Sequence, residues 1–235
     1  MLCKVADLIV DIPEAGDLVP RSREYLWKGN NGADITIRTD LFQPEYWPTL
    51  QEDDMIYMES GMQFYSGLLL HDGLMLHSSA VVLDGKAYLF SGPCGMGKST
   101  HTRLWQVTFG EGAVVINDDK PALRFVDGAW YTYGTPWCGK DGINVNRKAP
   151  LAGICFLRQA QENKIRRLST LEATQKILTQ TIHKLKRADK MDRLLSCLDS
   201  LVRRIPVFEL ENRPEPEAAR LSYETMRRAA EELGL

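Results

Sequence analysis

The sequence has almost no net charge, no paired cysteines and no long apolar run. Lys and Arg number 29 and Asp and Glu number 31, so no overall field attracts nucleic acid or an anionic membrane. Its five cysteines are scattered without a CxxC pair, which indicates reduced thiols and excludes a zinc site. No stretch approaches the ~18 apolar residues of a membrane span, and the first residues do not resemble a signal peptide. We therefore expect a cytoplasmic protein with neither a nucleic-acid nor a membrane partner.

The composition is that of an ordinary folded chain. Of 235 residues, 44% are hydrophobic and 26% are charged, and this length suits one domain or a domain with a small appendage. Short runs at residues 5–10 and 34–39, separated by glycine and proline, predict strands. We therefore expect a β-rich N-terminal segment over residues 1–52, packed on a larger domain over residues 53–235.

The larger domain alternates the sequence patterns of strands and helices. Asp84-Gly85 and Asp127-Gly128 each join two apolar runs and predict two-residue hairpins, because both central positions need a positive φ. Ser169 to Glu172 forms a capping box, which predicts the start of a helix. Periodicity predicts strands at 74–83, 86–90, 113–116, 152–157 and 207–210, and helices at 53–70, 98–107, 171–185, 191–201 and 217–233. The predicted fold class is therefore α/β with a mixed sheet and C-terminal helices.

One glycine-rich stretch carries the strongest chemical signal. Residues Gly92 to Ser99 read GPCGMGKS, which matches the Walker A phosphate-loop (P-loop) pattern, and a predicted strand precedes it and a helix follows it. Backbone N–H groups and the helix N-terminus could surround a polyphosphate, with Lys98 at the β- and γ-phosphates and Ser99 on Mg²⁺. A chance glycine-rich turn is the alternative, which the correct flanks disfavour. The expected nucleotide-binding residues here are Gly92, Cys94, Gly95, Met96, Gly97, Lys98, Ser99 and Thr100.

Two adjacent carboxylates follow the next predicted strand. Asp118 and Asp119 come just after residues 113–116, and residues past the carboxyl end of a neighbouring strand stand beside a phosphate loop. One carboxylate could hold Mg²⁺ while the other accepts the proton of an attacking hydroxyl. The alternative is a plain turn, because Asp is common in turns. We expect a functional pair and favour Asp118 as the base.

Two weaker signals accompany these motifs. His77 lies on the predicted strand that pairs, through the hairpin, with the strand entering the glycine-rich stretch. The loop from Gly134 to Asn144 carries Lys140 and is followed by Arg147, and such fixed positive charge would stabilise a transferring phosphoryl group. The same loop could instead be structural, with Trp137 filling the core. Both interpretations stay open.

The order of these pieces resembles the catalytic domain of HPr kinase/phosphorylase, which has a phosphoenolpyruvate carboxykinase-like P-loop fold. That family places a His on the strand before a hairpin, then a Ser-Gly-x-Gly-Lys-Ser type loop, then a strand that ends in paired aspartates. This chain has His77, Gly92 to Ser99 and Asp118-Asp119 in the same order. The resemblance covers residues 77 to 119, with a weaker match from 134 to 157.

The resemblance implies ATP and Mg²⁺ at the loop, Asp118 or Asp119 as proton acceptor, and His77 near the phosphates. It implies that Lys140 and Arg147 also face the phosphates, and it makes a homo-oligomer one option. A short β-rich segment stands where the family has its N-terminal domain. We therefore expect an acceptor other than HPr, namely a serine of a protein or peptide, or a small-molecule hydroxyl.

The sequence as a whole predicts an ATP-dependent kinase that transfers the γ-phosphoryl group to a hydroxyl by positioning and charge neutralisation. One alternative is a regulatory module that binds ATP without catalysis. Another is an ATPase in which water is the acceptor. The intact Lys98, Ser99 and paired aspartates favour the kinase over the regulatory module.

Overall fold

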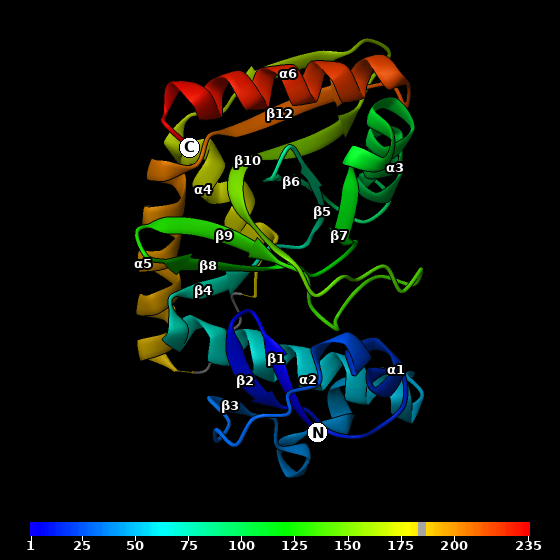
Figure 1. The fold of residues 1–235 in the computed structure, drawn as a ribbon, viewed down its shortest axis with the longest axis vertical. Coiled ribbons are helices and arrows are strands. Elements are labelled where there is room, and N and C mark those ends of the chain that lie inside the picture. The colour runs from blue at the N-terminus through cyan, green and yellow to red at the C-terminus, as the bar shows by residue number, and fades with distance from the viewer. Residues whose placement is uncertain (183–186) are drawn as a thin grey trace.

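The computed structural model describes residues 1–182 and 187–235 and is built around a curled mixed sheet (Figure 1). Nine strands of the described chain join it in the order β4-β8-β9-β10-β6-β5-β7, with β12 paired to β10 and β11 paired to β12. The strands are β4 (Gly73–Met75), β5 (Ser78–Leu83), β6 (Lys86–Ser91), β7 (Val114–Asn117), β8 (Ala122–Val126), β9 (Ala129–Tyr133), β10 (Lys148–Gln159), β11 (Lys164–Arg167) and β12 (Val207–Asn212). The predicted mixed α/β class is confirmed.

Strand β10 connects the two halves of this sheet. It begins antiparallel to β9, with Lys148 opposite Tyr133, and continues parallel to β6 and β12, where Ile154 faces both Leu89 and Val207. Residues 151–157 are all buried, which explains a continuous apolar run where a half-exposed strand would alternate. This parallel pairing carries β6 to the same edge of the sheet as β10 and β12.

Helices cover both faces of the sheet (Figure 1). On one face α3 (Lys98–Phe109) packs with α6 (Pro216–Glu232), and Trp105 and Met226 are fully buried in their shared core. On the other face α4 (Thr170–Thr179) packs with α5 (Ala188–Arg204) through a second core. The predicted capping box at Ser169 is present and starts α4. The helix predicted to reach residue 185 ends at Thr179, and Leu185 lies outside the described residues.

The N-terminal segment forms a three-stranded sheet packed on α2, in the lower part of Figure 1. Its elements are β1 (Leu2–Val5), β2 (Leu8–Asp11), β3 (Ile35–Thr36) and α1 (Leu18–Ser22), with the 3₁₀ helices η1 (Arg23–Tyr25), η2 (Thr39–Leu41) and η3 (Pro44–Tyr46). Helix α2 (Glu52–Leu68) and η4 (Leu69–His71) come next in the chain, and η5 (Gly110–Gly112) follows α3. The division at residue 52 stays a prediction.

Three predicted strands differ from the observed ones. Residues 5–10 are not one strand, because Ala6 and Asp7 take positive φ and reverse the chain between β1 and β2. Residues 34–39 contribute only β3, which pairs for two residues with β2. Residues 74–83 split into β4 and β5, since β4 pairs with β8 whereas β5 pairs with β6 and β7. His77 therefore lies in the link between two strands rather than on one strand.

The two predicted hairpins are confirmed. Asp84 and Gly85 both have positive φ between β5 and β6, and Asp127 and Gly128 do so between β8 and β9. The first hairpin delivers β6 to the glycine-rich stretch, so a local turn signal positions the start of that loop. Within the part of the chain that the structure describes, no helix is long and apolar enough to cross a bilayer.

Replacing Gly134 with alanine should destabilise the fold strongly. A Cβ at this position would overlap the carbonyl oxygen of Val145 and lie 2.7 Å from that of Ile116, and backbone atoms cannot move aside as a side chain can. We expect Gly134→Ala to lower the free energy of unfolding by about 3 kcal/mol. Gly32→Ala is the control, because nothing lies within 4 Å of a Cβ there. Equal denaturant midpoints for the two variants would contradict this packing.

Candidate functional site

The stretch Gly92–Ser99, here called the glycine-rich loop, joins β6 to the N-terminus of α3. Gly95 and Gly97 have φ of 80° and 92°, a conformation that residues with a side chain rarely adopt. Gln159, at the end of β10, donates a 3.1 Å hydrogen bond to the Gly95 carbonyl and ties the loop to the sheet. The strand–loop–helix context that the sequence predicted is therefore present.

Lys98 is folded back onto this loop. Its Nζ donates to the carbonyl oxygens of Gly92 at 2.9 Å and Pro93 at 3.3 Å, and the residue is 9% exposed. Burial lowers the pKa of Lys98, while the carboxylates of Asp119 and Asp118 act in the opposite direction. Lys98 therefore lies within electrostatic reach of both carboxylates.

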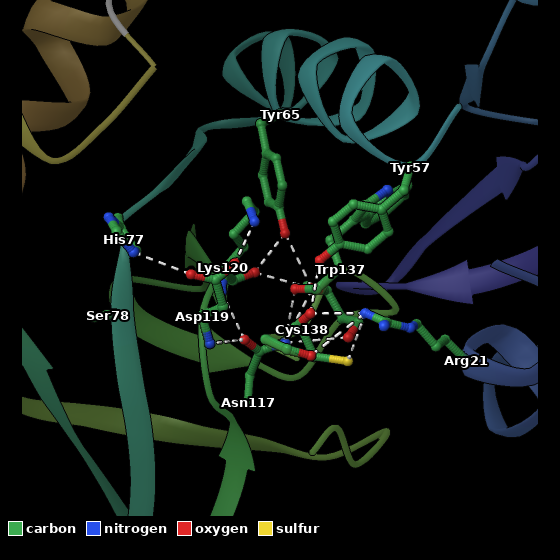
Figure 2. A network of polar contacts seen from close by, with 12 residues as sticks. Arg21, Tyr57, Tyr65, His77, Ser78, Asn117, Asp119, Lys120, Trp137 and Cys138 are labelled. Carbon is green, nitrogen blue, oxygen red and sulfur yellow. Dashed lines mark hydrogen bonds and ion pairs between the residues drawn. The ribbon is translucent and has the colours of Figure 1, made fainter. Parts of the chain in front are cut away.

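A buried amide orients the two carboxylates. Asn117, the last residue of β7, accepts hydrogen bonds at its Oδ1 from the backbone N–H groups of Asp119 and Lys120. Its Nδ2 donates to the carbonyl oxygens of Thr135 and Trp137, 3.1 and 3.3 Å away (Figure 2). Asn117 therefore fixes the turn after β7 and joins it to the following loop. This role was not predicted from the sequence, although an Asn before paired aspartates at a strand end is a turn signal.

Asp118 faces helix α3. It is 7% exposed and accepts a 2.7 Å hydrogen bond from the Ser79 hydroxyl, which lies 2.9 Å from the Thr102 hydroxyl on α3. Thr102 in turn lies one turn after Ser99 and donates to its carbonyl. Asp118 is therefore held on the side of the first turn of α3, where Ser99 lies.

Asp119 faces His77 and Lys120 (Figure 2). The His77 Nε2 lies 3.0 Å from Asp119 Oδ1, and the Lys120 Nζ contacts Oδ2. Burial alone would raise the pKa of Asp119, but the hydrogen bond from His77 and the charge of Lys120 lower it to about 2. The structure thus brings His77 and Asp119 together, although 42 positions of sequence separate them.

The loop after β9 packs against the paired aspartates. A Cβ on Gly139 would lie in ordinary van der Waals contact with both aspartates, 3.6 Å from Asp119 Cβ and 3.7 Å from Asp118 Oδ2. Trp137 is fully buried, stacks on Phe64 with ring centroids 4.6 Å apart, and donates from Nε1 to Ser60. Trp137 therefore fills the core, as one of the two open interpretations expected.

The two cations expected near the phosphates differ in position. Lys140 is exposed and lines the same cavity as Asp119. Arg147 is also exposed, but it lines neither of the two cavities described below, and its backbone carbonyl accepts from the Gly134 N–H. Lys140 thus lies in the cavity of Asp119, which no residue of the glycine-rich loop lines, and the phosphate contacts of Lys140 and Arg147 stay predictions.

Two cavities flank the site. The first, here called the loop cavity, has a volume of about 750 Å³ and is lined by Gly95–Gly97, Thr100 and Leu104 together with Asn212 and Arg213 at the end of β12. The second, here called the Asp119 groove, has a volume of about 640 Å³ and lies between the N-terminal segment, α2 and residues 138–140. One ligand-sized cavity therefore adjoins the glycine-rich loop, and the other adjoins Asp119.

The donor set suits a magnesium ion that is held jointly with phosphates. Among the described residues, no group of three or more His, Cys, Asp or Glu side chains could hold a metal by itself. Mg²⁺ is commonly bound through one or two carboxylates, with waters and substrate phosphates completing its octahedron. Ser99 and Asp118, on the α3 side, have the oxygen ligands for that arrangement.

Comparisons with known proteins match the chain to one family model and to distant solved structures. The family model described as SynChlorMet cassette protein ScmC matches residues 49–213. Among solved structures, the Hpr(Ser) kinase/phosphatase from Coxiella burnetii aligns over 68% of this chain and 92% of its own, with 13% identity and a TM-score of 0.39. No curated protein matches the chain.

Replacing His77 should move the titration of Asp119. Because the His77 hydrogen bond lowers the pKa of Asp119, we expect His77→Ala to raise it from about 2 toward its ordinary value of about 4. The measurement is an NMR titration of the Asp119 carboxyl carbon. His71→Ala, which removes a half-buried histidine outside the site, should leave the titration unchanged. An unshifted midpoint in His77→Ala would contradict the contact.

The contact between His77 and Asp119 also determines how the stability of the fold changes with pH. The folded pKa of Asp119 lies below its unfolded value, so its contribution to stability is present above about pH 4 and is lost as the pH falls toward 2. Acid unfolding of His77→Ala should therefore show a weaker dependence on pH in this range than the wild type. Identical profiles for the two proteins would contradict this sign.

Proposed function

The chain belongs to the SynChlorMet cassette protein ScmC family, and we propose that it is an ATP-dependent kinase that transfers the γ-phosphoryl group to a hydroxyl. One observation carries the proposal. The Walker A loop with Lys98 follows β6, and the two carboxylates follow β7. Because β5 lies between these strands and pairs antiparallel with both, the lysine and the carboxylates come to the same edge of the sheet. Phosphoryl transfer needs this combination, since it depends on positioning and on neutralising charge rather than on covalent chemistry.

The glycine-rich loop would bind the polyphosphate. Its backbone N–H groups and the N-terminus of α3 attract negative charge, and the Lys98 ammonium would exchange the Gly92 and Pro93 carbonyls for phosphate oxygens. The loop cavity has room for the nucleoside beside Thr100 and Leu104. Cys94 and Met96 would take part through the backbone of the loop.

Mg²⁺ would lie between Ser99 and Asp118. The ion would neutralise charge on the transferring group and orient its oxygens. Ser79 donates to Asp118 Oδ1, which leaves the other carboxylate oxygen for a ligand. This role differs from the one that the sequence favoured for Asp118.

Asp119 would accept the proton of the attacking hydroxyl. Its carboxylate lines the Asp119 groove, from which an acceptor can approach, whereas Asp118 lines neither cavity. The low pKa of about 2 keeps Asp119 ionised, and His77 and Lys120 orient it. A carboxylate of this kind contributes mainly by holding the hydroxyl for in-line attack. We therefore assign the base to Asp119 and the metal to Asp118.

Substitutions should separate nucleotide binding from transfer. We expect Lys98→Ala to weaken ATP binding by about tenfold or more, because a charge-assisted contact is lost. Asp119→Asn should retain ATP affinity and lower transfer by about 10²- to 10⁴-fold. Calorimetry with ATP and Mg²⁺ measures the first effect, and transfer from γ-labelled ATP into host-cell extract measures the second.

Lys4→Ala and Asp192→Asn are the matched controls, since both remove the same kind of charge from exposed positions away from the cavities. Both should behave as the wild type. ATP binding that survives Lys98→Ala at full strength would refute the role of the loop. Full transfer by Asp119→Asn would refute the assignment of the base.

A further inference from the structure

The Asp119 groove lies beside Asp119 and is separate from the loop cavity that the nucleotide would occupy. Three parts of the chain that are distant in sequence line it: Arg21 at the end of α1, residues 46–50, and the α2 residues Tyr57 and Met58. Residues 138–140 and Asp119 complete the lining. A hydroxyl held in this groove would therefore be next to the carboxylate that we propose as base.

The inner wall of the groove is held in a single arrangement. The Tyr57 hydroxyl donates to the Cys138 carbonyl at 2.7 Å, and an Arg21 Nη donates to the same oxygen at 2.8 Å (Figure 2). The Arg21 guanidinium lies 5.0 Å and the Lys120 ammonium 5.2 Å from the centre of the Tyr57 ring. These contacts pre-organise the groove, so a ligand does not have to order it.

The outer wall is apolar and is also anchored. Trp47 donates from Nε1 to Glu59 on α2 at 2.7 Å, which holds residues 46–50 against the helix. Tyr46 is nevertheless 57% exposed and Leu50 is 37% exposed, and both line the groove together with Met58. Exposed apolar side chains gathered in a cavity indicate a ligand that has apolar side chains of its own.

The charges of the groove do not favour a ligand of one sign. Arg21 pairs with Asp17, and Lys120 pairs with Asp119. Lys140 and Asp54 also line the groove, and neither has an ion-pair partner among the described residues. One free cation and one free carboxylate suit a ligand that carries both signs, whereas a sugar would leave the apolar wall uncovered and a polyanion would meet Asp54.

From this lining we propose that the groove binds a short unfolded peptide whose Ser or Thr hydroxyl reaches Asp119 and whose adjacent apolar side chain lies against Tyr46 and Leu50. A peptide supplies the apolar surface, the charges of both signs and the hydroxyl together. The volume of about 640 Å³ falls within the range of roughly 300 to 1,000 Å³ that suits a ligand rather than a folded partner. The proposal rests on the proposed kinase function and names its acceptor.

The chemical step follows from that placement. The peptide hydroxyl oxygen forms a bond to the γ-phosphorus of ATP, and the bond from that phosphorus to the oxygen bridging to the β-phosphate breaks. The hydroxyl proton passes to Asp119. The products are a phosphopeptide and ADP, so ATP and the peptide are the only reactants.

The test uses three peptide pools with γ-labelled ATP and Mg²⁺. In one pool a central Ser has Leu or Phe as its neighbour, in the second the neighbour is Asp or Glu, and in the third Ala replaces the central Ser. Glycerol and free serine serve as small hydroxyl probes. We expect label in the first pool above all and none in the third. Equal labelling of the first two pools, or label only in the small probes, would overturn the proposal.

Variants of the wall test the groove itself. Leu50→Ala should lower kcat/KM for the first pool about tenfold, mainly through KM, because one apolar contact is lost. Its ATP affinity should stay unchanged. Leu41→Ala is the control, since Leu41 is 55% exposed on the same segment but lies outside the groove. Unchanged kinetics of Leu50→Ala would overturn the proposal.

A photo-cross-linker on the peptides of the first pool separates the groove from the kinase function, because cross-linking needs no ATP. Adducts within residues 46–58 are expected. Such adducts without any phosphate transfer would support the groove and refute the kinase. Phosphate transfer with adducts confined to other residues would be consistent with the kinase function and would refute peptide binding in the Asp119 groove.

Discussion

The buried side chain of Asn117 is the interaction on which the arrangement of the site depends. It is fully buried, and its amide bonds both the turn that follows β7 and the loop that follows β9. An unpaired amide at this depth would cost about 1–3 kcal/mol of folding free energy. Separating the turn after β7 from the loop after β9 would therefore destabilise the fold by about that amount. Because of this link, Asp118 faces α3 while Asp119 faces the N-terminal segment.

Asp118 and Asp119 therefore have different environments, although both belong to the turn after β7. Asp118 is fixed by Ser79, which itself contacts Thr102 on α3. Asp119 is fixed by His77 and Lys120. Because the two carboxylates lie on two sides of the turn, the proposed function can give them distinct roles.

Local signals in the sequence were sufficient for much of the fold. The Asp84-Gly85 and Asp127-Gly128 hairpins, the capping box at Ser169 and the strand–loop–helix context of the glycine-rich loop all depend on short stretches of backbone, and all are present. The reversal at Ala6 and Asp7 was missed because Ala6 is not a signal for positive φ and no glycine follows Asp7, as one follows Asp84 and Asp127. The split between β4 and β5 was missed because it depends on which distant strands each one pairs with.

The residues of the candidate site could be predicted from the sequence, but the direction in which each aspartate faces could not. The motif order brought His77, Lys98 and the paired aspartates into one hypothesis, and the structure brings the same residues together. Sequence spacing could not indicate which aspartate faces a cavity, since that follows from Asn117 and from the approach of Gly139. Nor could it indicate the contribution of Arg21 and Tyr57, which are distant in sequence and in the fold contact each other and the Cys138 carbonyl.

The most direct test of the account is the structure of the chain with Mg²⁺ and a non-hydrolysable ATP analogue. The account predicts the polyphosphate within the glycine-rich loop, the Lys98 ammonium on its terminal oxygens, and the γ-phosphate on the side of Asp119 and its groove. An analogue bound elsewhere on the sheet, or a terminal phosphate directed away from Asp119, would contradict the claim that the loop and the aspartates form one site for phosphoryl transfer.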